Sequence, residues 1–406
     1  MKRLISLSVV DQALLSALSL AINLVLVKFA NPASVGSFAV ASAMTFLALG
    51  AQNAVVITPA AVRIYGVGAE KQKAILSTLT SVDLLLNCAL TIACLVGSLA
   101  MGFTLLQSAS AAVFLSSSLI RELARGVLIG SGNVQRCIML DGLCVLLCAI
   151  GTPLLWSRLA PEAACLLALA AGNILSSWAY SPELHRQPTR LKHHLANYPH
   201  YWVESRWMLI GASATELHER SYVFMLQLLR GMTTVGTVHA GRILIAPISL
   251  LTTAWGRAMR PRMAALMENG QHAVARSILL SGLAITTTLT LAYLAALFTL
   301  WGFIDRQLFA GRYENMLPIV AAWCGYGLLS IPANCLSFYF QAERRFKPLA
   351  LNAVVSGAGS LACMLLLLLP VPDLTAIICL YAGIIIVLIA QFGWWFRPPV
   401  PLGVKP

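Results

Sequence analysis

The sequence is poor in charge and contains no long hydrophilic domain. Of its 406 residues only 11% are charged, whereas 59% are hydrophobic. No soluble core could bury so large an apolar fraction, which excludes an ordinary water-soluble globular protein. Apolar stretches of roughly 20 residues recur along the chain, and each is long enough to cross about 30 Å of hydrocarbon. Because a backbone inside the bilayer must satisfy its own hydrogen bonds, these stretches predict membrane-spanning helices.

Sequence motifs of several enzyme classes are also missing. There is no GxxxxGK[ST] loop for nucleotide phosphates, and neither HExxH nor GxSxG occurs. The ten cysteines include no CxxC pair and no suitably spaced histidine, so they are expected to be buried hydrophobes and not disulfides or metal ligands. We therefore expect a protein that is not an enzyme and that needs no cofactor or metal.

Apolar periodicity and polar breaks predict an all-α polytopic membrane protein of about 12 transmembrane helices. The expected spans are 9–30, 36–60, 75–102, 105–130, 137–156, 161–180, 206–229, 233–257, 277–302, 315–341, 348–369 and 372–395. The longest hydrophilic connection separates the first six from the last six. We predict an N-terminal lobe over 1–180, a cytoplasmic linker over 181–205 and a C-terminal lobe over 206–406. Six spans per lobe give both the same orientation, which predicts two parallel six-helix lobes around a central cavity.

Basic residues are distributed unequally between alternate connections. Of the 28 lysines and arginines, nineteen fall in one alternating set of connections and five in the other, and four lie inside spans. The positive-inside rule then places both termini in the cytoplasm. The basic residues are scattered singly and form no single patch, so nucleic acid is not an expected partner. The first apolar stretch is long and runs into the next, which predicts a membrane helix and not a cleaved signal.

The densest group of ionisable residues inside a span is Glu216, His218, Glu219 and Arg220, near the middle of the seventh. Each such group is costly in hydrocarbon unless it meets a partner or a wet cavity. Glu216 and Arg220 lie one helical turn apart and could neutralise each other in a packed helix. Alternatively Glu216, Glu219 and His218 could couple transport to protons, because carboxylates and imidazoles titrate near neutral pH in such surroundings.

The eighth span contains His239 and Arg242, which lie three residues apart and share a helix face. A buried arginine cannot lose its charge and needs an anion. That anion is either a carboxylate such as Glu219 or a phosphate of the substrate. Arg220, His239 and Arg242 are therefore candidate substrate-binding cations.

Arg121, Glu122 and Arg125 lie in the cytoplasmic half of the fourth span, with the two arginines one turn apart. They could extend to the inner membrane interface, or they could form a cationic entry site for a diphosphate. Lys28, near the other end of the first span, is expected to be an interfacial anchor.

Four more polar residues interrupt apolar helices. Asp83, with Asn87 in the third span, is expected either to pair with Arg121 or Arg125 or to bind a coupling ion. Asp11 and Asp141 lie near the cytoplasmic ends of their spans, where they would cap helices or pair with arginines of the connections.

The segment that begins at Glu219 has a recurring family pattern. The acidic residue is followed by a run that ends at Val235 and Gly236, by the small residues Ala240 and Gly241, and by Pro261 with a short amphipathic connection. The first half repeats the pattern as ANPASVGSFAVASA, and QAERRFKPLALNAVVSG is similar to the connection before an eleventh helix. The chain thereby resembles polysaccharide-type (O-antigen or exopolysaccharide, Wzx-like) flippases of the multidrug/oligosaccharidyl-lipid/polysaccharide (MOP) exporter superfamily.

This resemblance implies a transporter of the bacterial inner membrane that works by alternating access. Its implied substrate is an oligosaccharide linked to undecaprenyl diphosphate, used in cell-surface polysaccharide biosynthesis. The implied partners are this substrate, membrane lipids, and a polysaccharide polymerase with its chain-length machinery. Twelve helices argue against the peptidoglycan-precursor branch, which usually has fourteen. The alternatives are a cation-coupled multidrug antiporter of the same superfamily and a membrane enzyme of polysaccharide assembly.

Overall fold

The computed structural model describes residues 2–60, 69–181, 198–309 and 311–396, and throughout these ranges the regular structure is helical. The described chain divides into two compact units, unit 1 over Met1–Glu216 and unit 2 over Leu217–Pro406. The boundary between them falls inside one long helix, α10 (Pro199–Arg230). Most of the expected linker over 181–205 lies outside the described residues, and the predicted central cavity stays a prediction.

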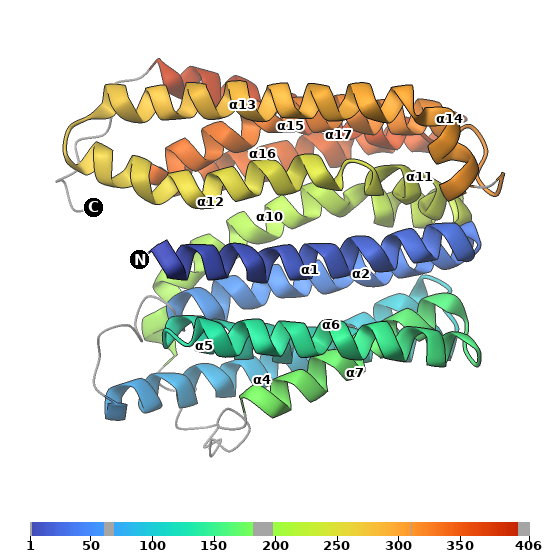
Figure 1. Ribbon diagram of the computed structural model, residues 1–406, viewed down its shortest axis with the longest axis horizontal. Helices are drawn as coiled ribbons and strands as arrows, with labels where there is room; N and C mark the ends of the chain where they lie inside the picture. The colour runs from blue at the N-terminus through green and yellow to red at the C-terminus, as the bar shows by residue number, and fades with distance from the viewer. Residues whose placement is uncertain (1, 61–68, 182–197, 310, 397–406) are drawn as a thin grey trace. The chain divides into compact units, whose positions relative to one another are not determined.

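Unit 1 consists of six spans and the first part of α10. Its elements are α1 (Lys2–Phe29), α2 (Pro32–Gln52) with the π-helical turn η1 (Asn53–Ile57), α4 (Ala69–Ala100), α5 (Leu105–Gly130), α6 (Val134–Trp156) and α7 (Pro161–Tyr180). In Figure 1 these helices run side by side, and α5 and α6 both pack against α7.

Unit 2 contains the rest of α10 and the remaining spans. Its further elements are α11 (Met232–Ile243), α12 (Ala246–Glu268), α13 (His272–Thr299), α14 (Trp301–Ile304), η2 (Asp305–Phe309), α15 (Met316–Ala342), α16 (Phe346–Met364), η3 (Leu365–Leu368) and α17 (Thr375–Trp395). Helix α15 packs against α11, α12, α13 and α17, so it forms the centre of this unit.

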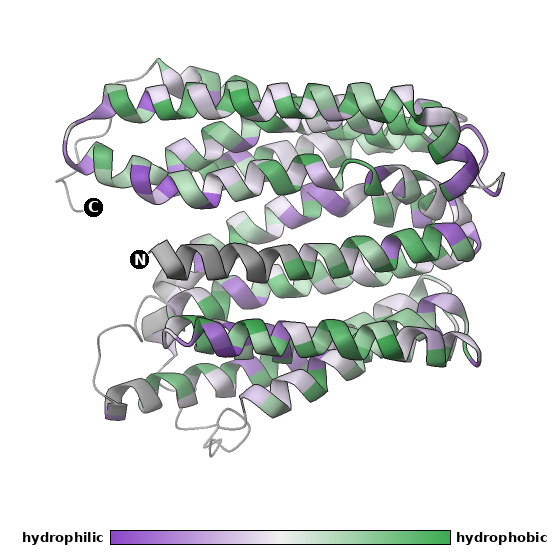
Figure 2. Cartoon of the chain, in the orientation of Figure 1, coloured by the Kyte–Doolittle hydropathy of each residue, from purple (hydrophilic) through white to green (hydrophobic). Residues whose placement is uncertain are grey.

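The helices confirm the predicted all-α membrane architecture. Among the described residues, eight helices are long and apolar enough to cross a membrane, and the bent pair α11–α12 adds a ninth. Helices α1, α5 and α10 account for the other three of the twelve predicted spans, with α5 and α10 containing the ionisable residues singled out above. Figure 2 shows hydrophobic residues along much of most helices, whereas α10 and α12 carry hydrophilic residues within their length.

Helix α6 shows the inverted burial of a membrane protein. Its apolar residues Met139 and Leu146 are both 55% exposed, whereas Asp141 is completely buried. A water-soluble helix would bury the apolar side chains and expose the aspartate. The exposed apolar face therefore fits hydrocarbon, and Asp141 turns inward to partners on α5.

The eighth predicted span is not one straight helix. Helices α11 and α12 meet at an angle of 53° across Leu244 and Ile245, and α12 continues to Glu268, beyond the expected end at residue 257. Pro247 in the first turn of α12 has no N–H to donate, which favours a helix start there. The hydroxyl of Tyr293 on α13 donates to the Leu244 carbonyl at 2.6 Å, which satisfies a backbone acceptor exposed by the bend.

Close packing of α6 on α7 depends on Gly172. A Cβ atom at this position would lie 2.9 Å from the Cys148 Sγ and 3.1 Å from the backbone oxygen of Cys144. Small residues let membrane helices approach closely. A Cβ on Gly172 would crowd the backbone oxygen of Cys144, which cannot be moved by a change of side-chain rotamer.

We expect Gly172→Ala to destabilise the protein by about 1–3 kcal/mol because α6 and α7 must move apart. The measurement is the midpoint of thermal unfolding of the purified protein in detergent. Gly142→Ala on α6 is the matched control, since a Cβ there meets nothing within 4 Å. Equal midpoints for the two variants would contradict the packing account.

Candidate functional site

Five side chains of unit 2 form a polar and aromatic group that we call the Arg242 cluster. Glu219 and Tyr222 come from α10, His239 and Arg242 from the last turns of α11, and Trp323 from α15. The cluster therefore lies beside the bend between α11 and α12. Broken helices inside the membrane expose backbone groups and are common at transporter binding sites.

Arg242 is held by Glu219 through two contacts. Its NH2 atom lies 3.3 Å from the Glu219 Oε2, and its NH1 atom donates to the Glu219 backbone oxygen at 3.2 Å. Of the two partners expected for Arg242, the structure thus contains the carboxylate of Glu219. The carboxylate contact is longer than the 2.7–2.9 Å typical of a well-formed charge-assisted hydrogen bond. The ion pair is therefore loose.

Aromatic rings support the guanidinium. Its central carbon lies 5.5 Å from the ring centre of Tyr222 and 5.5 Å from that of Trp323. Both rings are fully buried, and the Trp323 indole donates to the backbone oxygen of Val238 at 2.9 Å. Cation–π contacts of this kind favour arginine over lysine and fix the guanidinium in place.

Small residues make this arrangement possible. A Cβ atom on Gly241 would lie 2.8 Å from Ile319 and 3.3 Å from Trp323, both on α15. The glycine lets α11 approach α15 closely, and the neighbouring Arg242 reaches the Trp323 ring as a result.

Tyr222 also connects His239 to the cluster. Its hydroxyl lies 3.0 Å from the His239 Nδ1 and 3.5 Å from the Arg242 NH1. The shared face predicted for His239 and Arg242 is therefore present, and a single tyrosine touches both. A hydroxyl that donates to the imidazole still offers its lone pairs to the arginine.

The exposure of the pair is unequal. The side chain of Arg242 is 20% exposed and that of Glu219 is 46% exposed. Charged groups in the middle of a span do not face lipid tails, because that would cost several kcal/mol. The carboxylate of Glu219 is the more exposed member of this pair.

The arginines of unit 1 have a different environment. Arg125 donates from Nε to the Asp141 Oδ2 at 2.9 Å and from NH1 to the Glu122 Oε2 at 2.8 Å. Arg121 donates to the Cys144 Sγ at 3.4 Å and lies 3.8 Å from the Asp141 Oδ1. Two cations thus meet two carboxylates. This network is more suited to holding α5 against α6 than to binding an anionic substrate.

Among the described residues, the partners of Asp141 are Arg125 and Arg121 of α5. Asp141 is completely buried. The expected cap or pairing with an arginine of a connection stays a prediction. The side chain of Asp11 lies outside the described side chains, so that expectation stays a prediction.

Asp83 does not pair with Arg121 or Arg125 among the described residues. It accepts a hydrogen bond of 2.7 Å from the amide of Gln52, which also donates to the Leu119 backbone oxygen at 2.8 Å. Asn87, one turn along α4, donates to the backbone oxygen of Ser116. Asp83 is therefore a buried carboxylate with a neutral partner, and ion binding is the alternative that stays a prediction.

The group predicted in the seventh span is spread over both units. Glu216 lies in unit 1, where its Cγ is 3.2 Å from the position of a Cβ on Gly50 of α2. His218 lies in unit 2, buried, with Nδ1 3.0 Å from the Ser360 hydroxyl. Arg220 is partly buried on the same helix. Pairing of Glu216 with Arg220 stays a prediction.

Sequence reasoning missed the aromatic part of the cluster. Tyr222 and Trp323 look like ordinary apolar residues of their spans, and a Trp in a membrane helix carries no local signal for a partner on another helix. Tyr222 did carry a usable hint, since it lies three residues after Glu219 and so shares a helix face with it. Gln52, the partner of Asp83, was missed for the same reason as Trp323.

Comparison with known proteins identifies the fold. No family model and no curated protein matches the sequence. Among solved structures, the lipid II flippase MurJ in an inward closed conformation is 14% identical, covers 97% of this chain and 88% of that chain, and gives a TM-score of 0.77. An inward-facing MATE family multidrug resistance transporter of the MOP superfamily is 13% identical, with 93% and 92% covered and a TM-score of 0.72.

A third similar structure is a MOP superfamily transporter from Pyrococcus furiosus. It is 16% identical, with 97% of this chain and 94% of that chain covered and a TM-score of 0.59, and its binding pocket is described as reversed in polarity, suggesting a different function. The chain therefore has the fold of MOP superfamily transporters.

We expect Asp141→Ala to destabilise the protein by about 3–5 kcal/mol, because it removes the fully buried carboxylate that Arg125 and Arg121 share and leaves only the partly exposed Glu122 beside Arg125. Thermal unfolding in detergent measures the effect. Glu268→Ala is the control, since its ion pair with Arg344 is exposed on both sides and worth about 0–1 kcal/mol. Removing both partners of the buried pair, in Arg125→Met with Asp141→Leu, should recover part of the loss. A midpoint for Asp141→Ala equal to that of Glu268→Ala would contradict a structural role for the network.

Proposed function

We propose that this protein is a transporter that moves an oligosaccharide linked to undecaprenyl diphosphate across the bacterial inner membrane, with Arg242 as the group that binds the diphosphate. The observation that carries the proposal is the loose, partly exposed ion pair between Arg242 and Glu219 beside a broken helix. The fold of MOP superfamily transporters supports a transport function and alternating access between two openings.

The chemistry of the Arg242 cluster favours an anion. A guanidinium keeps its charge at any physiological pH and can contact two oxygens of one phosphate at once. Tyr222 and Trp323 hold it from the sides, so it does not need to reorganise when a ligand arrives. The carboxylate of Glu219 is a single, long contact, and a diphosphate with more than one negative charge can replace it.

Replacement of Glu219 also offers a route to ion coupling. Protonation of Glu219 would break its ion pair with Arg242 and so raise the affinity of Arg242 for an anion. Because the coupling of two binding events is reciprocal, binding of the anion would favour protonation of Glu219. Glu216, His218 and Asp83 are the other candidates for coupling. Arg220 of α10 is a second cation that would contribute to the attraction of the substrate.

The wider setting of the proposal follows from the same substrate. A lipid-linked oligosaccharide is assembled in the cytoplasm and used outside, so the proposed localisation is the inner membrane with both termini cytoplasmic. The proposed role is the export step of cell-surface polysaccharide biosynthesis, beside a polymerase and its chain-length machinery.

One observation favours a second candidate, a cation-coupled multidrug antiporter of the same superfamily. Glu219 is more exposed than Arg242, so a cationic drug would meet the carboxylate first. In that case Arg242 would hold Glu219 in place and would not touch the substrate. The two candidates therefore predict opposite roles for the two members of one ion pair.

We expect Arg242→Ala to reduce transport of a polyprenyl-diphosphate oligosaccharide by roughly 10-fold to 100-fold, the effect of losing one charged hydrogen-bonding partner. Arg242→Lys should fall between the wild type and the alanine variant, because it keeps the charge and loses the planar contact with the rings. The measurement is translocation of the labelled lipid in proteoliposomes at matched protein content. Arg158→Ala, at an exposed position after α6, is the control and should transport normally.

The same proteoliposomes distinguish a transporter of anionic lipid from a multidrug antiporter. If the wild type transports a cationic dye and not the anionic lipid, and Glu219→Gln abolishes transport of the dye, the substrate is a cation and the proposed function fails. If Glu219→Gln retains transport of the anionic lipid, the carboxylate is a replaceable partner as proposed.

A further inference from the structure

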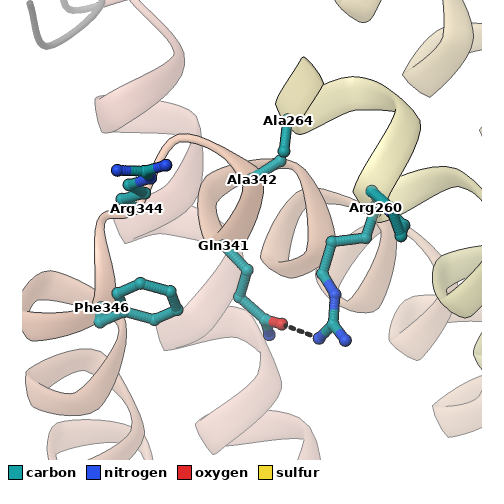
Figure 3. A pocket seen from close by; sticks show the side chains of 7 residues that line it. Arg260, Ala264, Gln341, Ala342, Arg344 and Phe346 are labelled. Carbon is teal, nitrogen blue, oxygen red and sulfur yellow. Dashed lines mark hydrogen bonds between the residues drawn. The ribbon is translucent and has the colours of Figure 1, made fainter. Parts of the chain in front are cut away.

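A separate cavity of about 280 Å³ lies in unit 2 where α12, the end of α15 and the start of α16 meet. Its walls include Arg260 from α12 and Gln341, Arg344 and Phe346 from the α15–α16 turn (Figure 3). None of its lining residues belongs to the Arg242 cluster, which lies at the other end of α12. The proposed function does not account for this cavity.

The polar side chains that line the cavity are Arg260, Gln341 and Arg344, and no carboxylate is among the lining residues. Arg260 NH1 donates to the Gln341 Oε1 at 2.8 Å, so the charge of Arg260 meets a neutral acceptor, and among the described residues it has no carboxylate partner. With its oxygen occupied, the Gln341 side chain presents its NH2 group. Arg344 forms an exposed pair with Glu268, which occupies only part of its five donors. A lining of donors without a carboxylate suits a ligand with several acceptor oxygens.

The backbone of Arg344 supports a role for its side chain. Its φ angle is 61°, in the left-handed region that favours glycine, at the turn that ends α15. A non-glycine residue in this conformation is strained, because its Cβ crowds the backbone. The backbone at this position favours glycine, yet the sequence has an arginine. Its side chain is 66% exposed and pairs with Glu268.

The surroundings of the cavity are basic on one side and apolar on the other. Seven basic residues and two acidic ones occur in 257–276 and 343–347, namely Arg257, Arg260, Arg262, Arg276, Arg344, Arg345, Lys347, Glu268 and Glu343. Phe346 at the rim is 60% exposed, and Leu351 on the next turns of α16 is also exposed. By the positive-inside rule this end of unit 2 lies at the inner surface of the membrane.

We propose that this cavity binds the phosphodiester headgroup of an anionic phospholipid of the inner leaflet. Arg260, Gln341 and Arg344 contact the phosphate oxygens, and the acyl chains leave past Phe346 along the exposed apolar surface of α16. Basic pockets between membrane helices on the cytoplasmic side are suited to such headgroups. The bound lipid joins α12 to the α15–α16 turn and so stabilises the half of the broken span that does not carry Arg242.

The test is lipid binding to the purified full-length protein in detergent, followed by native mass spectrometry during titration with phosphatidylglycerol or phosphatidylcholine. We expect the wild type to bind phosphatidylglycerol more tightly than phosphatidylcholine. The double variant Arg260→Gln with Arg344→Gly should weaken phosphatidylglycerol binding by roughly 10-fold or more, as expected for loss of charged hydrogen bonds. Glycine at 344 relaxes the left-handed backbone, so the loss does not come from a disturbed turn.

Arg136→Gln is the matched control, because Arg136 is an exposed arginine at the start of α6, outside the cavity. An equal loss in this control would show diffuse surface attraction and overturn the site. Unchanged binding in the double variant, or equal binding of the two lipids by the wild type, would also overturn it. A further experiment adds a short polyprenyl diphosphate as a competitor of phosphatidylglycerol. If it displaces phosphatidylglycerol from the cavity at comparable concentration, the occupant is the transport substrate and the assignment to phospholipid is wrong.

Discussion

A charged side chain inside the hydrocarbon layer needs a partner, and the two units of this protein meet that requirement in different ways. In unit 1, Arg125 is held between Asp141 and Glu122 at hydrogen-bond distance, so its charge meets two carboxylates. In unit 2, Arg242 has aromatic rings on its sides and one loosely held carboxylate. The first arrangement stabilises helix packing, and the second leaves a cation that can change its partner.

The bend between α11 and α12 explains why the exchangeable cation lies where it does. A straight helix would place Arg242 in a regular hydrogen-bonded turn, surrounded by neighbouring side chains. At the bend, the Tyr293 hydroxyl donates to the backbone oxygen of Leu244, and Gly241 lets α11 approach α15 closely. The guanidinium can therefore rest on Trp323 and still remain partly exposed. The bend between α11 and α12 therefore explains where the Arg242 guanidinium lies, which rings support it and why it is partly exposed.

The sequence predicted the fold well because its main signal is local. Spans are long apolar runs, and the alternation of basic connections checks their number, so all twelve predicted spans correspond to helices. The break at Leu244 and Ile245 was missed although Pro247 marks it. Partners within the site were harder to predict, because they depend on which helices pack together. Glu219 was named as a partner of Arg242, yet Trp323 on α15 and Gln52 beside Asp83 carried no pattern in the sequence.

Binding of a matched pair of ligands to the purified protein shows whether Arg242 binds the charged head of the substrate. Isothermal titration would compare a short-chain polyprenyl diphosphate with the polyprenyl alcohol of the same chain. We predict that the wild type binds the diphosphate at least about 10-fold more tightly, a difference of about 1.4 kcal/mol, and that Arg242→Ala loses this preference. Equal binding of both ligands by the wild type, or an unchanged preference in Arg242→Ala, would show that Arg242 does not bind the diphosphate.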